Sequence, residues 1–167
     1  MVNVLVGIAV LVLLVVRQLQ PRPAREDSSL RLMAILAIVG VVELGSAVKK
    51  AHEHAISASA VALLVAGLVI GAVFGAVRAM TVHIWRDESG AAWRRGTAVT
   101  AVLWVVSLGV HLLGDALLDH VSSVKGLGTS SILLYLAITL GVQREIVRMR
   151  AARITHGRPA IDWRNSR

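Results

Sequence analysis

The sequence predicts an all-α integral membrane protein: a bundle of five transmembrane helices with the N-terminus outside and the C-terminus in the cytoplasm. Composition, apolar stretches and the distribution of basic residues support this fold class. Of the 167 residues, 56% are hydrophobic and 17% are charged, whereas soluble domains average about 45–50% apolar and about 25% charged residues. The mean hydropathy is +0.71. We therefore expect one membrane bundle without a separate soluble domain.

Five apolar stretches approach the roughly 20 residues that a helix needs to cross a bilayer core. They cover residues 2–17, 32–49, 56–78, 97–115 and 126–143, in a bundle of residues 1–147 followed by a basic cytoplasmic tail, 148–167. Between the third and fourth stretches, a turn signal from Asp87 to Gly90 is flanked by β-branched and aromatic residues. This pattern favours a small cytoplasmic hairpin at 81–95, with an interfacial extension of the third helix as the alternative.

Basic residues are concentrated in the segments expected in the cytoplasm. The loops after the first and third stretches carry four arginines each, and the segment from Arg144 onward carries seven. The opposite loops carry the other three of the 18 basic residues, all of them lysines. Positive charge is retained in the cytoplasm, so this distribution predicts the orientation and explains the net charge of +8 without a nucleic-acid partner. The residues expected at the membrane surface, against anionic lipid headgroups, are Arg78, Arg86, Arg94, Arg95, Arg144 and Arg148.

Two of the stretches carry a polar stripe. In the fourth, polar residues recur at steps of three or four and so share one side of a helix: Thr97, Thr100, Trp104, Ser107, His111, Asp115 and Asp119. In the fifth, Ser131, Tyr135, Thr139 and Gln143 repeat every four residues. Lipid disfavours polar side chains, so we expect the two stripes to meet inside the bundle. They indicate either a polar seam that joins helices or a proton, ion or metal site at His111 and Asp115.

Other ionisable residues fall in the same outer half of the predicted bundle. A carboxylate facing lipid is costly, so Glu43 is expected inside the bundle, within reach of Ser107, His111, Asp115 and Tyr135. The intramembrane polar residues of the prediction are Glu43, Ser107, Tyr135 and Thr139. The triplet His52–His54 contains imidazole and carboxylate ligands for a divalent metal. The alternative for this triplet is a solvated interfacial turn.

A ridge of small residues follows the third stretch. Gly67, Gly71 and Gly75 are spaced four apart and are followed by Ala79. Such a ridge allows another helix to approach closely. The neighbour belongs either to the same chain or to a homo-oligomer or membrane-protein partner.

The absence of several motifs restricts the chemistry. The chain has no cysteine, which excludes disulfides, thiolate metal sites and thiol nucleophiles. It also has no nucleophile elbow, HExxH motif or phosphate loop, which argues against an enzyme and leaves a membrane enzyme as an open alternative. The sequence requires no cofactor and leaves a divalent metal or haem open, although His111 alone is well within a span.

The segment GAVFGAVRAMTVHIWRDESGAAWRRGTAVTAVLWVVSLGV, residues 71–110, is similar to the central segment of the CcdC-like family of bacterial membrane proteins. Actinobacterial members show a similar succession of arginine, tryptophan, an acidic-glycine turn and Arg-Gly-Thr before a tryptophan-containing span. The Arg17–Pro23 stretch is also similar. The resemblance contains no catalytic signature, and it implies a multi-pass protein of the bacterial cell membrane in a family whose biochemical role is largely undefined.

Three function classes remain open. The first, which we rank highest, is a non-enzymatic accessory or assembly protein that acts through helix packing with partners. The second is a small proton- or ion-coupled transporter that uses Glu43 and the stripe around His111. The third is a metal- or haem-handling membrane protein that uses the polar cluster in the outer half.

Overall fold

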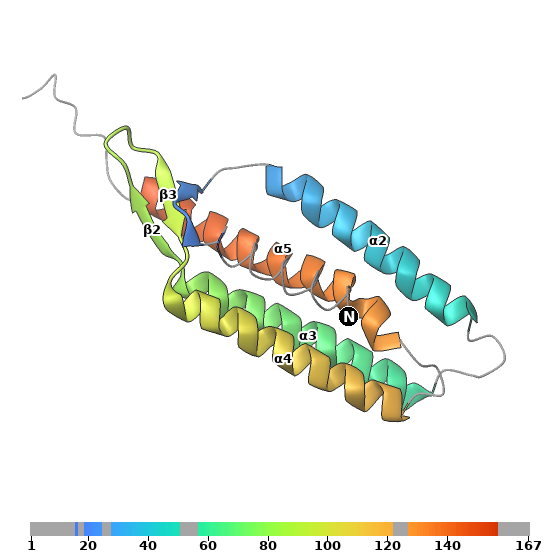
Figure 1. The fold of residues 1–167 in the computed structure, drawn as a ribbon. Coiled ribbons are helices and arrows are strands. Elements are labelled where there is room, and N and C mark those ends of the chain that lie inside the picture. Colours follow the sequence, from blue (N-terminus) through green and yellow to red (C-terminus); the bar gives the residue numbers. More distant parts are fainter. Residues whose placement is uncertain (1–15, 17–18, 25–27, 51–56, 122–126, 157–167) are drawn as a thin grey trace, which may run out of the picture.

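The structure is a computed structural model that describes residues 16, 19–24, 28–50, 57–121 and 127–156. This part of the chain contains four helices and a small sheet (Figure 1). The helices are α2 (Ser28–Lys50), α3 (Ala58–Thr81), α4 (Ala98–Val121) and α5 (Leu127–His156). The strands are β1 (Arg22–Pro23), β2 (His83–Arg86) and β3 (Ala92–Arg95). The first expected span, apart from Val16, and the His52–His54 triplet lie outside the described residues.

Three segments of these helices are long and apolar enough to cross a membrane: Ala58–Thr81, Ala98–His120 and Ser130–Ile154. They correspond to the third, fourth and fifth expected spans, so the protein is mostly helical with three candidate membrane spans. The second expected span is helical and forms most of α2. The helix α5 continues past residue 143, so residues 148–156 of the expected tail are helical.

The helix α5 is the centre of the bundle. It contacts α2 along one side and α3 and α4 along the other, while α3 and α4 also pack against each other (Figure 1). The helices approach each other closely at two glycines. A Cβ atom on Gly40 of α2 would lie 2.5 Å from the backbone nitrogen of Leu134, and one on Gly75 of α3 would lie 2.5 Å from the carbonyl oxygen of Thr139. Glycine therefore allows both helix pairs to meet backbone to backbone.

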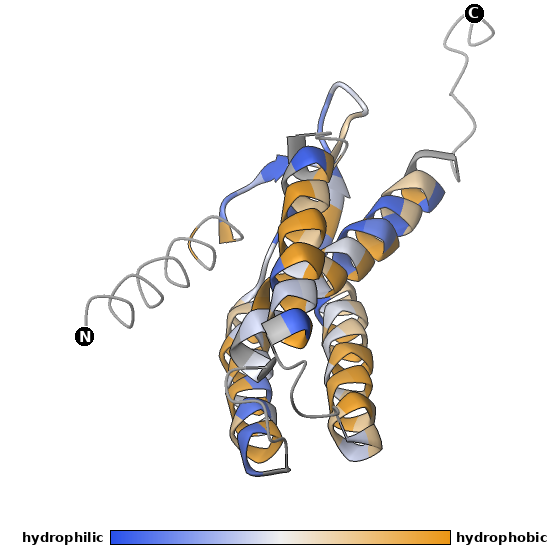
Figure 2. Cartoon of the chain, turned by 90° about the vertical axis from the view of Figure 1, so that its right-hand side faces the viewer, coloured by the Kyte–Doolittle hydropathy of each residue, from blue (hydrophilic) through white to orange (hydrophobic). Residues whose placement is uncertain are grey.

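Apolar side chains cover the outward faces of α3 and α4. The exposed ones recur every three or four residues, which is the spacing of one helix face. Among them are Val61, Val65, Val69, Val73 and Val77 in α3, and Val99, Val102, Val106, Val110, Leu113 and Leu117 in α4; Ile70, Met80, Val105 and Leu112 are exposed as well. Figure 2 shows that apolar residues predominate along these helices. Such faces suit contact with lipid chains.

The two ends of α3 are stabilised in different ways. Ser57 is the N-cap, and its hydroxyl oxygen accepts a hydrogen bond of 3.2 Å from the backbone nitrogen of Ala60. At the other end, the guanidinium of Arg150 in α5 donates to the carbonyl oxygens of Ala79 and Val82. Carbonyls at a helix C-terminus lack intrahelical partners. Arg150 therefore ties the end of α3 to α5.

The hairpin predicted between the third and fourth spans is present. Strands β2 and β3 pair antiparallel, with Trp85 opposite Trp93, and β1 pairs with the other side of β3. The alternative, a longer third helix, is wrong because α3 ends at Thr81 and Val82 has extended backbone angles. A small apolar cluster of Ala79, Val82 and Val147 joins the end of α3, the chain entering β2 and α5.

Asp87 organises the hairpin turn. Its Oδ1 accepts hydrogen bonds from the hydroxyl of Ser89 (2.7 Å) and the backbone nitrogen of Ala91 (2.8 Å), and its Oδ2 accepts one from Nε1 of Trp93 (2.9 Å). These bonds stabilise the ionised carboxylate, and the bond from Ser89 contributes most to holding the pKa of Asp87 below its ordinary value. Gly90 has φ 84°, a conformation that favours glycine.

Candidate functional site

The polar faces of α4 and α5 lie inside the bundle. In α4, Thr100, Trp104, Ser107 and His111 are buried, Asp115 is half-buried and Asp119 is exposed, and Thr97, just before the helix, is half-buried. In α5, Ser131, Tyr135, Thr139 and Gln143 are buried. The structure therefore brings together the two stripes, with the exception of Asp119 at the end of α4.

Tyr135 links the two polar faces. Its hydroxyl lies 2.5 Å from the hydroxyl of Ser107 and donates to the carbonyl oxygen of Ser107 at 3.0 Å. One turn further along α5, the hydroxyl of Thr139 donates to the carbonyl oxygen of Gly71 in α3 at 3.2 Å. These bonds pair the buried hydroxyls, as burial requires, and join α5 to both α3 and α4.

His111 is fixed in position but its Nε2 atom has no hydrogen-bond partner. The imidazole stacks on the ring of Tyr135, with 4.3 Å between ring centroids and 18° between planes. Nε2 lies 3.8 Å from Oδ2 of Asp115, the residue one turn along the same helix face. This distance exceeds that of a direct hydrogen bond. Among the described residues, Nε2 is therefore a buried polar atom without a hydrogen-bond partner.

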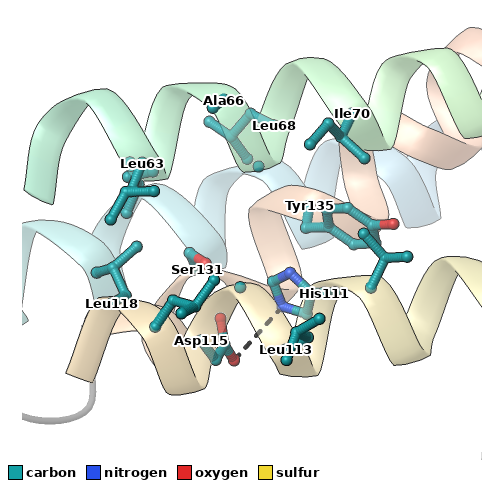
Figure 3. Close-up of a pocket in the computed structure, with 15 residues that line it drawn as sticks. Leu63, Ala66, Leu68, Ile70, His111, Leu113, Asp115, Leu118, Ser131 and Tyr135 are labelled. Carbon is teal, nitrogen blue, oxygen red and sulfur yellow. Dashed lines mark ion pairs between the residues drawn. The ribbon is translucent and has the colours of Figure 1, made fainter. Parts of the chain in front are cut away.

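A pocket of about 210 Å³ lies between α3 and α4. Figure 3 shows its walls: apolar side chains of α3 lie on one side, α4 lies on the other, and two polar residues of α5 close the back. The polar lining consists of His111, Asp115, Ser131 and Tyr135. The remaining lining is glycine and apolar residues: Leu63, Leu64, Ala66, Gly67, Leu68, Ile70, Val110, Leu113, Gly114, Leu117 and Leu118. The pocket is thus an apolar space with one polar wall.

The pocket offers few ligands for a bound metal ion. The described residues contain no group of three or more His, Asp or Glu side chains placed to hold a metal ion. His111 and Asp115 together supply two ligands, whereas zinc sites use three or four protein ligands. Their geometry instead leaves a nitrogen and a carboxylate available to a molecule in the pocket.

The expectation for Glu43 is wrong. Its side chain is exposed on α2, and α2 packs against α5 rather than against the polar face of α4. Glu43 lies seven residues before the end of α2 at Lys50, which is roughly 10 Å of helix. A glutamate side chain is too short to span this distance, so the exposure of Glu43 follows instead from packing: α2 meets α5 through the side of the helix that carries Gly40.

The expectation that Arg78 lies at the membrane surface is also wrong. Its side chain is 0% exposed, and the carbon at the centre of its guanidinium lies 3.8 Å from the centroid of the Trp104 ring. All three guanidinium nitrogens are buried without a hydrogen-bond partner in the part of the chain that the structure describes. Arg78 follows Gly71 by seven residues and Gly75 by three, so the helix turns it toward the packed interior.

Next to Arg78, the hydroxyl groups of three threonines form hydrogen bonds between the end of α3 and the beginning of α4. The hydroxyls of Thr81 and Thr100 lie 2.8 Å apart, and those of Thr97 and Thr100 lie 3.2 Å apart. Thr97 also donates to the carbonyl oxygen of Thr81 at 3.1 Å. These contacts hold the beginning of α4 against the end of α3.

The glycine ridge is used mainly within the chain. Gly71 and Gly75 are buried, and Cβ atoms there would lie 2.5 Å from the Tyr135 ring and 2.5 Å from the Thr139 carbonyl oxygen, respectively. Gly67 differs, since no described side chain or distant backbone atom lies within 4 Å of its Cβ position. The open side of Gly67 faces the pocket that it lines.

The other predicted surface arginines are less buried than Arg78. Arg86, Arg94 and Arg144 are half-buried, and Arg95 and Arg148 are exposed. Nε of Arg95 donates to the carbonyl oxygen of Leu19 at 3.1 Å, and Arg148 forms an ion pair of 2.6 Å with Glu145. All five lie in the sheet or the second half of α5, at the same end of the bundle (Figure 1).

Comparison with protein-family models, curated proteins and solved structures finds no match for this chain. Sequence reasoning missed the pocket and the contact of Arg150 with the end of α3. It placed Arg78 by its charge, although the helical spacing from the buried glycines contained the signal for its burial.

Proposed function

We propose that this chain is a non-enzymatic, five-span protein of the bacterial cell membrane that binds a small, lipid-soluble molecule in the pocket between α3 and α4. The observation that carries this proposal is the His111–Asp115 pair at the wall of an otherwise apolar pocket. Ligand sites commonly combine an apolar lining with a few polar groups that orient the ligand. Both helices that form the main walls are long and apolar enough to cross a membrane.

The five-span topology is supported by charge. Fifteen basic residues fall in the two loops and the C-terminal segment assigned to the cytoplasm, against three in the opposite loops. In this orientation the sheet and the second half of α5 face the cytoplasm, where their arginines would contact anionic lipid headgroups. His111 and Asp115 would then lie in the outer half of the bundle.

Packing favours ligand binding over a role in which the glycine ridge recruits a partner. Gly71 and Gly75 already contact α5 of the same chain. A homo-oligomer or an accessory role would have to use other surfaces, such as the exposed apolar faces of α3 and α4. Proton or ion coupling would draw on His111 and Asp115, without the exposed Glu43.

The proposal is tested by measuring binding of para-propylanisole, a neutral apolar ring compound, to the purified protein in lipid nanodiscs. A cavity of about 150 Å³ in another protein holds benzene, so this pocket is large enough for a substituted ring. We expect saturable binding in calorimetry. We also expect it to weaken about tenfold or more in Gly67→Leu, because the added side chain would occupy the pocket.

Gly45→Leu is the matched control. Gly45 lies on α2, outside the pocket, and no described side chain or distant backbone atom lies within 4 Å of its Cβ position. It should leave binding unchanged. Equal binding by wild type and Gly67→Leu would contradict the proposed function.

A further inference from the structure

The polar wall of the pocket restricts which molecules fit it. We infer that the ligand carries a hydroxyl group on an apolar body, and that this hydroxyl binds between Nε2 of His111 and the carboxylate of Asp115. This inference rests on the proposed function and specifies the class of ligand.

The geometry of His111 is the first support. Its ring cannot turn freely, because it stacks on Tyr135, and Tyr135 is itself held by Ser107. Nε2 is therefore directed at a fixed place, and it is buried without a hydrogen-bond partner among the described residues. A buried polar atom in this condition costs free energy that a ligand atom can recover. Nε2 and Oδ2 of Asp115 lie 3.8 Å apart, close enough for a single oxygen atom at hydrogen-bond distance from each to contact both.

The chemistry of the pair is the second support. A hydroxyl both donates and accepts, so it can donate to the Asp115 carboxylate while it accepts from Nε2–H. A carbonyl oxygen cannot satisfy both groups, since it only accepts. A ligand carboxylate would be repelled by Asp115, and an ammonium group would be costly to bring into an apolar space.

The shape and lining of the pocket are the third support. Apart from the polar wall, glycine and apolar side chains line the space, and its volume of about 210 Å³ suits a ring with a short alkyl group. Leu63 and Ile70 of α3 lie across from the polar residues (Figure 3). The apolar body would contact these residues, and the hydroxyl would point to α4.

The test compares para-propylphenol with para-propylanisole, which replaces the hydroxyl by a methyl ether. We expect the wild-type protein to bind the phenol about tenfold more tightly, as one additional charge-assisted hydrogen bond provides. His111→Phe keeps an aromatic ring to stack on Tyr135 and should abolish this preference. His120→Phe, an exposed histidine outside the pocket lining, should retain it.

The outcomes separate this inference from the proposed function. Equal binding of phenol and ether would overturn the inference and leave the proposed function standing, whereas binding of neither would overturn both. A preference that survives in His111→Phe would show that another group recognises the hydroxyl. If His111→Phe does not fold, the inference is tested by the NMR chemical shift of the imidazole nitrogen of His111 in the wild-type protein. This chemical shift should change when the phenol is added and not when the ether is added, and equal changes would overturn the inference.

Discussion

Replacing Gly75 with alanine should destabilise the bundle by about 3 kcal/mol, at the upper end of the usual cost of overpacking. The added Cβ would lie 2.5 Å from the carbonyl oxygen of Thr139 and 3.2 Å from its carbonyl carbon. Both are backbone atoms, so no side-chain rotation relieves the contact. The helices α3 and α5 would have to separate, which disturbs the Thr139–Gly71 bond one turn away.

Gly67→Ala is the matched control on the same helix. No described side chain or distant backbone atom lies within 4 Å of the Cβ position at Gly67, so alanine there should raise the stability by up to about 1 kcal/mol through its better helix propensity.

Gly71→Leu should also disrupt the bundle, because it displaces the Tyr135 ring on which His111 stacks. Unfolding in detergent or bicelles gives the free energies. Equal stability of Gly75→Ala and Gly67→Ala would show that α3 does not pack on α5 at this register.

Replacing Arg78 with methionine should raise the free energy of unfolding, by about 1–4 kcal/mol, the range seen when buried ionic groups are replaced by apolar ones. Methionine retains the unbranched apolar stem and removes a charge whose nitrogens have no hydrogen-bond partner among the described residues. Stacking of the Arg78 guanidinium on Trp104 stabilises the folded protein by on the order of 2 kcal/mol, which is less than the cost of burying the charge.

Arg78→Lys is the control, because it keeps the charge and loses the planar group that stacks on Trp104. It should therefore be less stable than the wild-type protein, whereas Arg78→Met should be more stable. Reversible unfolding of the three purified proteins measures the order. A loss of more than about 1 kcal/mol in Arg78→Met would contradict this explanation and indicate that the guanidinium has a strong partner.

The helices, the hairpin and the polar faces could be predicted because each has a local signal. Apolar stretches mark the three candidate spans, and the turn from Asp87 to Gly90 separates β2 from β3. Four-residue spacing places Tyr135 and Thr139 on one face of α5, and both are buried. A pattern repeated along one helix thus identifies the face that packs.

The places of Glu43 and Arg78 could not be obtained from charge alone. The general rules put arginine at the membrane surface and a carboxylate inside the bundle, but the structure has Arg78 inside and Glu43 outside. Which side of α2 meets α5 depends on Gly40 contacting Leu134, a contact between residues far apart in sequence. The pocket depends in the same way on three helices meeting, so no local pattern predicts it.

Whether α4 and α5 cross a membrane is measured most directly by reporter fusions that are active only in the cytoplasm. We expect activity for fusions at Gly90 in the hairpin and after Arg167, and no activity for a fusion at Lys125, between α4 and α5. A periplasmic reporter at the same positions should give the opposite pattern. Cytoplasmic activity at Lys125 together with activity at Gly90 and after Arg167 would show that these helices do not cross as a pair, and would contradict a membrane pocket at His111.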